Sequence, residues 1–279
     1  MHKLTWDGTG THLFETGVDH GVLYPIDSSG AYPEGIAWNG LISITQSPSG
    51  ADETKLWADN IKFISMRSAE EFGGTIEAYT YPDEFGDCDG SARVTTGLRA
   101  GQQPRKAFVL CYRTLIGNDV DLDNHGYMLH LVYGATCSPS QKQYSSKSDS
   151  PEAITFSWEF TTNPVGFTGF KPTAYLEIDS TEFVTEGEKA LLAALEDKLF
   201  GVDGTATYTE FTGDTFAQGT TYYERSGTVG SYVYTPTSDT SYNSEKTYYT
   251  KSMVGASDSY LPLPDEVAET LGYTAPTGN

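Results

Sequence analysis

Two long apolar runs near the middle of the chain limit what it can fold into. The first, 108–116, carries apolar side chains on both of its alternating faces, and the second, 127–135, is also largely apolar on both. The segment between them, 117–126, is polar and rich in turn-forming residues, so the two runs predict a long β-hairpin. Strands with two apolar faces lie inside a packed assembly, because each face needs a cover.

The composition and the alternation of apolar and polar residues also predict a fold built of β-strands. Aromatic residues make up 13% of the chain, with 19 Tyr, 29 Gly and 13 Pro, which favours an all-β fold with many turns. A chain of 279 residues can bury a sizeable core. Alternating patterns predict further strands at 36–45, 60–66, 75–81, 154–162 and 173–179.

One amphipathic helix is predicted over 186–199. Thr185 is a suitable N-cap with Glu188 three residues later, and Gly201 can provide the left-handed stop. A leucine stripe at helical spacing indicates that this helix covers one face of a sheet. A further turn of helix is predicted at 68–72 from a second capping-box spacing.

The strands at 154–162 and 173–179 each have one apolar and one polar face. The polar positions carry only hydroxyls and acids, apart from one tyrosine. We interpret the following residues as a candidate wet face: Thr155, Ser157, Glu159, Thr161, Glu177 and Asp179.

Three polar segments have no clear periodicity. Residues 1–33 read as an extended arm, 83–104 as a long surface loop with several glycines, and 138–150 as a second loop. Loops of such length in a compact domain are usually functional or mobile.

The composition changes to Thr, Ser, Tyr and Gly between 208 and 252, where a repeat appears at a spacing of 26 residues. Two copies are fewer than the roughly three that a solenoid needs. We therefore predict a core domain at 1–204, an inserted β-hairpin module at 205–254 and a return to the core at 255–279. Four tyrosines of the repeat are candidates for stacking on sugar rings or, alternatively, for filling the small core of the module: Tyr222, Tyr223, Tyr248 and Tyr249.

The net charge and the cysteines argue against several classes of function and of site. The formal net charge of −21 repels phosphate backbones and anionic membranes, so we expect neither nucleic-acid binding nor membrane docking. Three widely spaced cysteines without a CxxC pattern indicate neither a disulfide framework nor a zinc ribbon. The first ten residues contain no apolar leader, and we expect a chain made and kept in a cytosol.

The sequence contains no strong motif for catalysis or metal binding. Asp119, Asp121, Asp123 and His125 space polar groups as in a calcium loop, but the twelfth position is His130 and the glycine comes two places late, which favours a solvated turn. The adjacent acids Asp83–Glu84 and Glu70–Glu71 could be proposed as a glycosidase pair, yet adjacency says little among 38 acids. We predict no enzyme, no metal site and no cofactor.

Several consecutive blocks together resemble the major tail proteins of long-tailed double-stranded DNA bacteriophages. The resemblance runs from Trp6 to the predicted helix and resumes near the C-terminus, and it leaves out 208–252. The blocks are WDGTGTHLFETGVDHGVLYP, residues 32–47, ADNIKFISMRSAEEFGGTIEAYTYPDEF, CDGSA, GQQPRKAFVLCYRTLIGND, HGYMLHLVYG, SPEAITFSWEFTT and LPLPDEV.

The resemblance implies a structural virion protein, a tail-tube subunit. It implies an all-β fold with a flanking α-helix, in which two packed β-sheets form a β-sandwich or barrel, and homo-hexameric rings that self-assemble into a stacked hollow tube. Genomic DNA would pass through this tube during ejection without specific binding. The implied partners are other copies of the chain, the tape-measure protein and other tail proteins, with no membrane, and the implied location is the phage tail, assembled in the host cytoplasm.

Within that scheme, the wet-face residues become candidate lumen residues. Asp119, Asp121, Asp123 and His125 become a candidate inter-subunit hairpin tip, and the three polar segments become candidates for contacts between copies, with mobile surface loops as the alternative. The runner-up interpretation of the whole chain is a β-sandwich carbohydrate-binding or adhesin-like module of a phage baseplate or cell surface.

Overall fold

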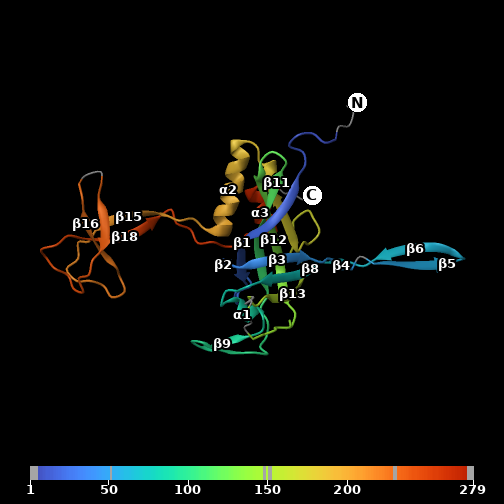
Figure 1. The fold of residues 1–279 in the computed structure, drawn as a ribbon, viewed down its shortest axis with the longest axis horizontal. Coiled ribbons are helices and arrows are strands. Elements are labelled where there is room, and N and C mark those ends of the chain that lie inside the picture. Colours follow the sequence, from blue (N-terminus) through green and yellow to red (C-terminus); the bar gives the residue numbers. More distant parts are fainter. Residues whose placement is uncertain (1–5, 51, 147–148, 150–152, 229–230, 275–279) are drawn as a thin grey trace. The chain divides into compact units, whose positions relative to one another are not determined.

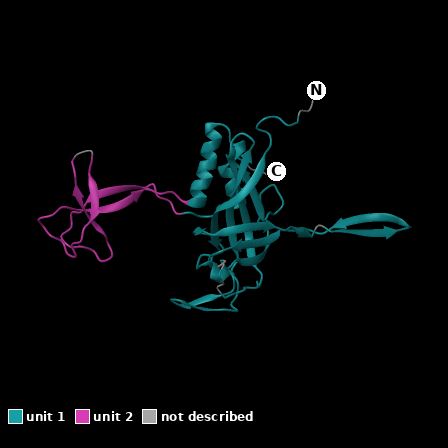
Figure 2. Cartoon of the chain, in the orientation of Figure 1, with its two compact units in different colours: residues 1–200, 259–279 teal, residues 201–258 magenta. Residues whose placement is uncertain are grey.

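The computed structural model describes residues 6–50, 52–146, 149, 153–228 and 231–274. These residues form two compact units, which Figure 2 distinguishes by colour. The first unit comprises 1–200 and 259–279, and the second comprises 201–258. The expected module at 205–254 lies within the second unit.

The first unit is built mainly of strands (Figure 1). Its strands are β1 (Phe14–Pro25), β2 (Ile36–Trp38), β3 (Leu41–Gln46), β4 (Ser49–Gly50), β5 (Glu53–Ala58), β6 (Ile61–Arg67), β7 (Glu70–Glu71), β8 (Gly73–Ala78), β9 (Ala92–Thr95), β10 (Leu98–Ala100), β11 (Phe108–Asn118), β12 (Leu122–Cys137), β13 (Phe156–Thr162) and β14 (Tyr175–Asp179). Its helices are α1 (Phe85–Cys88), α2 (Glu186–Phe200) and α3 (Pro264–Thr270), with a 3₁₀ turn at Ser180–Glu182. No helix among the described residues is long and apolar enough to cross a membrane.

Eight of these strands form one antiparallel sheet. Its order is β2-β1-β11-β12-β13-β8-β3, and β14 pairs with a second stretch of β12. The predicted hairpin of two apolar runs is the β11–β12 pair at its centre.

The sheet curls so that its two ends lie side by side, although no ladder of hydrogen bonds joins them among the described residues. Only Asn39 and Gly40 separate β2 from β3, so a short turn connects the two ends of the strand order. Trp38 in β2 lies against Trp158 in β13, with ring centroids 5.9 Å apart. A Cβ atom on Gly21 in β1 would come within 2.3 Å of Leu41 in β3, so these strands approach closely. The curled sheet encloses an aromatic-rich core that includes Trp38, Phe85, Phe108, Tyr112, Trp158 and Phe160.

The opposite face of the central strands packs against α2. Alternate residues of β11 and β12 point away from the enclosed core, and Leu192, Leu195 and Leu199 of the helix cover them. The predicted helix is confirmed together with its cap. The Glu188 carboxylate accepts a hydrogen bond from Thr185 N at 2.8 Å, and Gly201 ends the helix with φ +77°.

The predicted all-β class with a flanking helix is confirmed. The two packed layers that the resemblance implies are parts of one continuous, curled sheet. The central strands are apolar on both faces because one face lines the enclosed core and the other packs against α2.

Residues 14–25 were wrongly assigned to an extended arm. They form β1, which pairs with β11 along its length. Gly17 and His20 have positive φ, and the register shifts twice between Thr16 and Val22. These bulges interrupt the alternation of apolar and polar residues, which is why the strand was missed.

Two other segments differ from expectation. Residues 83–104 are structured, because Phe85 and Cys88 of α1 are buried in the enclosed core and β9 pairs with β10. Residues 68–72 contain no helical turn; Glu70 and Glu71 pair with β4 instead. In the loop 138–150, residues 147, 148 and 150 lie outside the described part of the chain.

The second unit is a four-stranded antiparallel sheet. Its strands are β15 (Thr205–Glu210), β16 (Tyr222–Ser226), β17 (Val233–Pro236) and β18 (Tyr248–Val254), in the order β15-β18-β16-β17. At its base, Val202 and Ser257 form an isolated bridge. In the first unit, Tyr260 N donates to Lys198 O at 2.8 Å, so the chain leaves and re-enters the core at neighbouring points.

Candidate assembly surfaces

The most conspicuous surface feature is the hairpin formed by β5 and β6. These strands pair only with each other, and the short β4–β7 pair connects them to β3 and β8 (Figure 1). Asp59 and Asn60, both with positive φ, make the two-residue turn. The hairpin is therefore an extension of the main sheet with its own ladder of hydrogen bonds.

The two faces of the β5–β6 hairpin differ in polarity. The register pairs Leu56 with Ile64 and Thr54 with Met66 on one face, where Ala58 and Ile61 also lie. The exposed fractions of the large residues on this apolar face are Leu56 43%, Ile61 63%, Ile64 47% and Met66 50%.

The other face is mainly charged, although it also carries Trp57, which is 66% exposed. Its charged residues include Glu53, Lys55 and Lys62, and both lysines form ion pairs with the Glu53 carboxylate. Isolated two-stranded hairpins are marginally stable in water, and contiguous apolar patches on a soluble surface usually mark an interaction site. The apolar face of the hairpin is therefore a candidate interaction surface.

A polar cluster, buried at Tyr112 and His130, holds the base of this hairpin on both sides. Before the hairpin, the Gln46 amide donates to the Tyr112 hydroxyl at 2.9 Å and contacts the Tyr175 hydroxyl. After it, the Phe72 ring stacks on Tyr175 with centroids 4.8 Å apart. His130 lies at the centre of the cluster, stacked on Tyr112 at 4.5 Å.

His130 is buried, and its ring nitrogens contact the Thr114 hydroxyl at 2.9 Å and the Tyr175 hydroxyl. Burial lowers the pKa of His130 below its usual 6.5, while the nearby Glu177 carboxylate, 3.7 Å away, opposes that shift. The neutral imidazole is therefore the form that the folded chain favours.

The lowered pKa of His130 predicts acid sensitivity. As pH falls through 6.5, the unfolded chain takes up the proton before the folded chain does, so the free energy of unfolding decreases until the folded pKa is passed. For one proton the slope is at most about 1.4 kcal/mol per pH unit. Urea unfolding followed by tryptophan fluorescence should show a smaller decrease for His130→Gln than for the wild type. His12→Gln, which alters an exposed histidine, is the control, and equal slopes in all three proteins would contradict the prediction.

The candidate lumen residues divide between two faces of the sheet. Ser157, Glu159 and Thr161 pair with Glu77, Thr75 and Gly73, which places them on the outer surface of β13 and β8. Thr155 is exposed just before β13. The outer surface of these strands thus carries hydroxyls and acids, as expected, and it continues onto β3, where Ser43 donates to Glu77 at 2.8 Å.

Glu177 and Asp179 lie on the other face of the sheet, where they pair with His130 and Met128 of β12 on the side of the enclosed core. Glu177 is exposed and Asp179 is half-buried, so the candidate wet-face residues of the two strands do not form one continuous surface. β12 pairs with β14 before Gly134 and with β13 after it, and the positive φ of Gly134 shifts the alternation of side chains by one residue between the two.

The predicted hairpin tip contacts the N-terminal segment of its own chain. The Asp119 carboxylate accepts hydrogen bonds from Gly10 N at 2.9 Å and His12 N at 3.4 Å, and these bonds lower the pKa of Asp119. Asp121 contacts His125 at 3.1 Å, while Asp123 is exposed. Among the described residues, no cluster of three or more potential ligands could hold a metal ion. Contact between this tip and another subunit stays a prediction.

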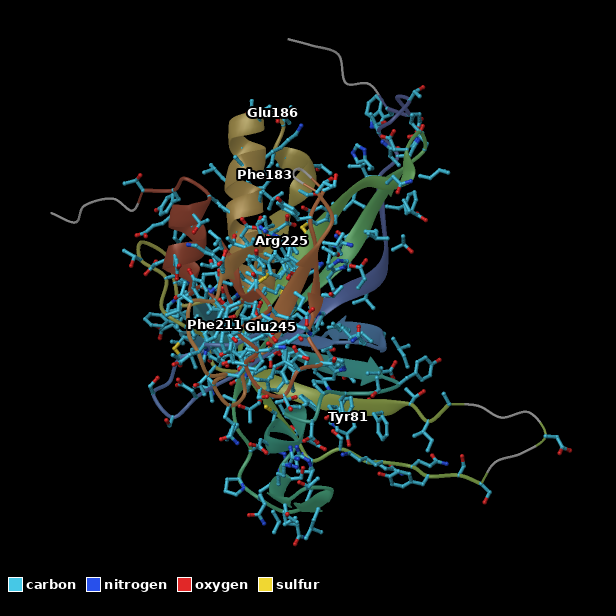
Figure 3. The ribbon with its side chains drawn as sticks, turned by 90° about the vertical axis from the view of Figure 1, so that its left-hand side faces the viewer. Tyr81, Phe183, Glu186, Phe211, Arg225 and Glu245 are labelled. Carbon is cyan, nitrogen blue, oxygen red and sulfur yellow. The ribbon has the colours of Figure 1, made fainter. Side chains whose placement is uncertain are left out.

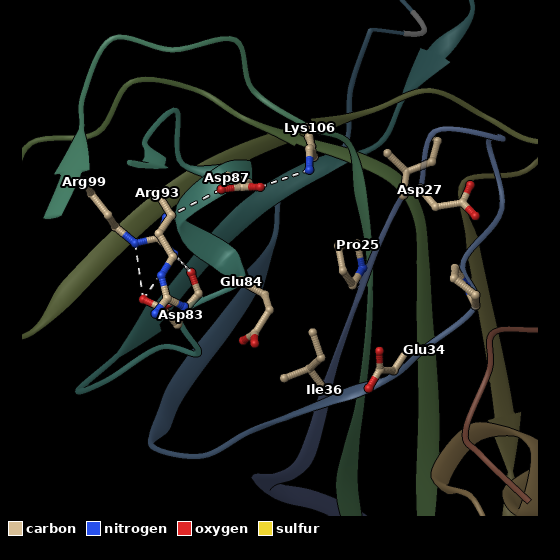
Figure 4. A pocket seen from close by; sticks show the side chains of 12 residues that line it. Pro25, Asp27, Glu34, Ile36, Asp83, Glu84, Asp87, Arg93, Arg99 and Lys106 are labelled. Atoms are coloured by element: carbon tan, nitrogen blue, oxygen red, sulfur yellow. Dashed lines mark hydrogen bonds and ion pairs between the residues drawn. The ribbon is translucent and has the colours of Figure 1, made fainter. Parts of the chain in front are cut away.

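A surface pocket of about 340 Å³ lies beside the segment 83–106 (Figure 4). Asp83 is paired with Arg93 at 3.3 Å and Arg99 at 3.1 Å, and Asp87 is paired with Lys106 at 2.9 Å. These pairs hold the segment together and leave the Asp83 carboxylate engaged rather than poised beside Glu84. The other adjacent acids, Glu70 and Glu71, point to opposite faces of β7, so they do not flank a common substrate bond.

The three cysteines are buried free thiols. Burial raises the pKa of Cys88 and Cys111 to about 12 and raises that of Cys137 as well. A thiol that stays protonated is a packing residue rather than a nucleophile.

Three of the four tyrosines proposed for surface recognition are buried. Tyr222, Tyr248 and Tyr249 are at most 5% exposed, and Tyr223 is half-buried. Tyr222 and Tyr248 pack against Phe216 in the interior of the second unit. A surface role for these two is therefore excluded by their burial.

Sequence reasoning missed the importance of the β5–β6 hairpin. It identified a strand near 60–66 but did not pair it with the preceding segment. The signal was present, because Asp59 and Asn60 form a turn between two runs that carry apolar residues. No protein-family model matches this chain, and no curated protein sequence matches it.

Proposed function

We propose that this chain is a phage tail-tube subunit, which self-assembles into stacked hexameric rings that form a hollow tube for DNA ejection. The observation that carries the proposal is the apolar face of the β5–β6 hairpin. In the isolated chain this face is exposed to water, and a neighbouring copy would cover it. A head-to-tail contact of this kind, repeated from copy to copy, generates rings or a stack.

Two other features support the proposal. The outer surface of β3, β8 and β13 carries hydroxyls and acids, and the whole chain has a net charge of −21. A channel wall of this character does not hold DNA, because it offers few cations to phosphate groups. The wall would then conduct DNA passively.

Electron microscopy of the purified chain tests the proposal. We expect rings or tubes whose abundance increases with protein concentration, because assembly follows mass action. A chain that sedimentation shows to be monomeric across a wide concentration range, and that forms no rings or tubes on the grid, would overturn the proposal.

One observation favours the alternative of a carbohydrate-binding module. The second unit exposes parts of several tyrosine rings on one face of its sheet. This face belongs to 201–258 alone, so a binding role there is compatible with assembly through the first unit.

A further inference from the structure

The internal repeat of the second unit becomes a symmetric sheet. In the order β15-β18-β16-β17, the outer strands β15 and β17 are repeat equivalents, as are the inner strands β16 and β18. The register follows the same symmetry. Tyr208 pairs with Lys251 as Tyr234 pairs with Arg225, and Tyr223 pairs with Tyr249 at the centre. A pseudo-two-fold axis therefore passes between the two inner strands.

The two faces of this sheet have different surroundings. On one face, Tyr222 and Tyr248 are covered by Phe211, Phe216 and Tyr242, which all pack against one or both of them. This face is the small hydrophobic core of the unit.

The opposite face carries four other tyrosines in a symmetric cluster. Tyr208 and Tyr234 stack with centroids 3.9 Å apart and an interplanar angle of 1°. Each also meets an inner ring edge-on, Tyr208 with Tyr223 at 5.2 Å and Tyr234 with Tyr249 at 5.2 Å. Tyr208, Tyr223 and Tyr234 remain partly exposed. We call this face the tyrosine face.

Two cations flank the tyrosine face at equivalent positions of the repeat. Arg225 and Lys251 are exposed, and neither has a carboxylate partner among the described residues, whereas Lys246 on the same unit is paired with Glu224 and Asp239. The Arg225 guanidinium, labelled in Figure 3, lies 4.9 Å from the centroid of Tyr249 and 4.3 Å from that of Tyr232. The Tyr249 hydroxyl is buried and has no hydrogen-bond partner within the part of the chain that the structure describes.

We propose that the tyrosine face binds an acidic polysaccharide. Partly exposed tyrosine rings pack well against the apolar faces of sugar rings and provide hydroxyls at their edges. Unpaired cations on an otherwise acidic chain attract carboxylates, and Arg225 can hold one in a bidentate manner. Because each half of the face offers at least one partly exposed tyrosine and one cation, neighbouring acidic sugars of one polymer can occupy both halves.

This inference is independent of tube assembly, since all its residues lie in the second unit. Single-stranded nucleic acid also binds aromatic rings beside cations. The direct stack of Tyr208 on Tyr234 prevents a base from intercalating between the two rings and leaves only the outer ring faces for any ligand. We therefore treat nucleic-acid binding as an outcome of the test.

The experiment compares three polymers as ligands of the full-length chain by isothermal titration calorimetry. Polygalacturonate has sugar rings and carboxylates, its methyl ester has the same rings without charge, and poly-glutamate has carboxylates without rings. We expect binding to polygalacturonate to be at least tenfold tighter than to either of the others. Equal binding to poly-glutamate, or tighter binding to single-stranded oligothymidylate, would overturn the proposal, as would the absence of binding to polygalacturonate.

Variants locate the site. Arg225→Gln combined with Lys251→Gln should weaken binding at least tenfold without unfolding the unit, because both side chains are exposed. Lys171→Gln is the matched control, since Lys171 is an exposed cation of the first unit. Tyr208→Ala combined with Tyr234→Ala should also abolish binding, with circular dichroism used to check the fold. If the two cation replacements leave the affinity unchanged, the ligand binds elsewhere and the assignment is wrong.

Discussion

Replacing Leu56 and Ile64 together by aspartate is expected to abolish ring and tube formation while leaving the chain folded. The two residues are cross-strand partners at the centre of the apolar face of the β5–β6 hairpin, and each is over 40% exposed in the isolated chain. A carboxylate buried at the contact between copies costs roughly 2 kcal/mol or more, because it loses its hydration without gaining a partner. Two such carboxylates lie at each contact, and their cost is repeated at every contact around a ring. The summed cost exceeds the free energy that holds an assembly of ordinary stability together.

The measurement is electron microscopy together with sedimentation velocity. The matched control replaces Lys55 and Ser65, cross-strand partners on the charged face of the same hairpin, by aspartate. This control adds two carboxyl groups to the same two strands and lowers the net charge by three rather than two, because it also removes the Lys55 cation. Normal tubes from the control would therefore show that added charge alone does not prevent assembly. Normal tubes from the Leu56 and Ile64 variant would show that the apolar face is not the assembly contact.

Replacing Phe85 by alanine is expected to lower the free energy of unfolding of the first unit by about 3–5 kcal/mol. Phe85 is fully buried and contacts Trp38 at 4.5 Å, Trp158 at 5.0 Å and Phe108 at 5.5 Å between ring centroids. Helix α1 has only four residues, so the helix itself contributes little to holding 83–106 in place. Loss of the ring removes the main attachment of this segment to the enclosed core.

Urea unfolding monitored by tryptophan fluorescence measures this change. Leu98→Ala is the control, because Leu98 lies in the same segment and is 53% exposed, so its replacement should change stability by about 0.5 kcal/mol or less. If Phe85→Ala proved as mild as Leu98→Ala, the segment would be a surface loop, as its sequence suggested.

Local signals allowed the sequence to predict the parts of the fold that depend on neighbouring residues. Helix α2 was predictable because its cap, its leucine stripe and its terminal glycine all lie within seventeen consecutive residues, 185–201. The β11–β12 hairpin was predictable for the same reason, since its two apolar runs flank their own turn.

Features that depend on distant pairing were not predictable in this way. Strand β1 is defined by its pairing with β11, almost a hundred residues later, and its bulges hide the alternation that would have revealed it. The separation of Glu177 from Glu159 depends on Gly134, which belongs to neither strand. The buried position of Tyr222 and Tyr248 depends on loops that fold back over one face of the second unit. The periodicity of a sequence assigns a residue to one face of its own strand. Which other residues pack against that face depends on how the strands pair.

The point at which the chain leaves and re-enters the core has a consequence for how such a protein can change. Lys198 and Tyr260 are joined by a single backbone hydrogen bond of 2.8 Å, so the core does not need the 201–258 segment to bring its two ends together. Any module with closely spaced termini can replace that segment without altering the register of a core strand. The position is thus a natural exchange point, where a lineage can acquire a new surface specificity, or an engineer can display a foreign domain, while the rest of the chain stays the same.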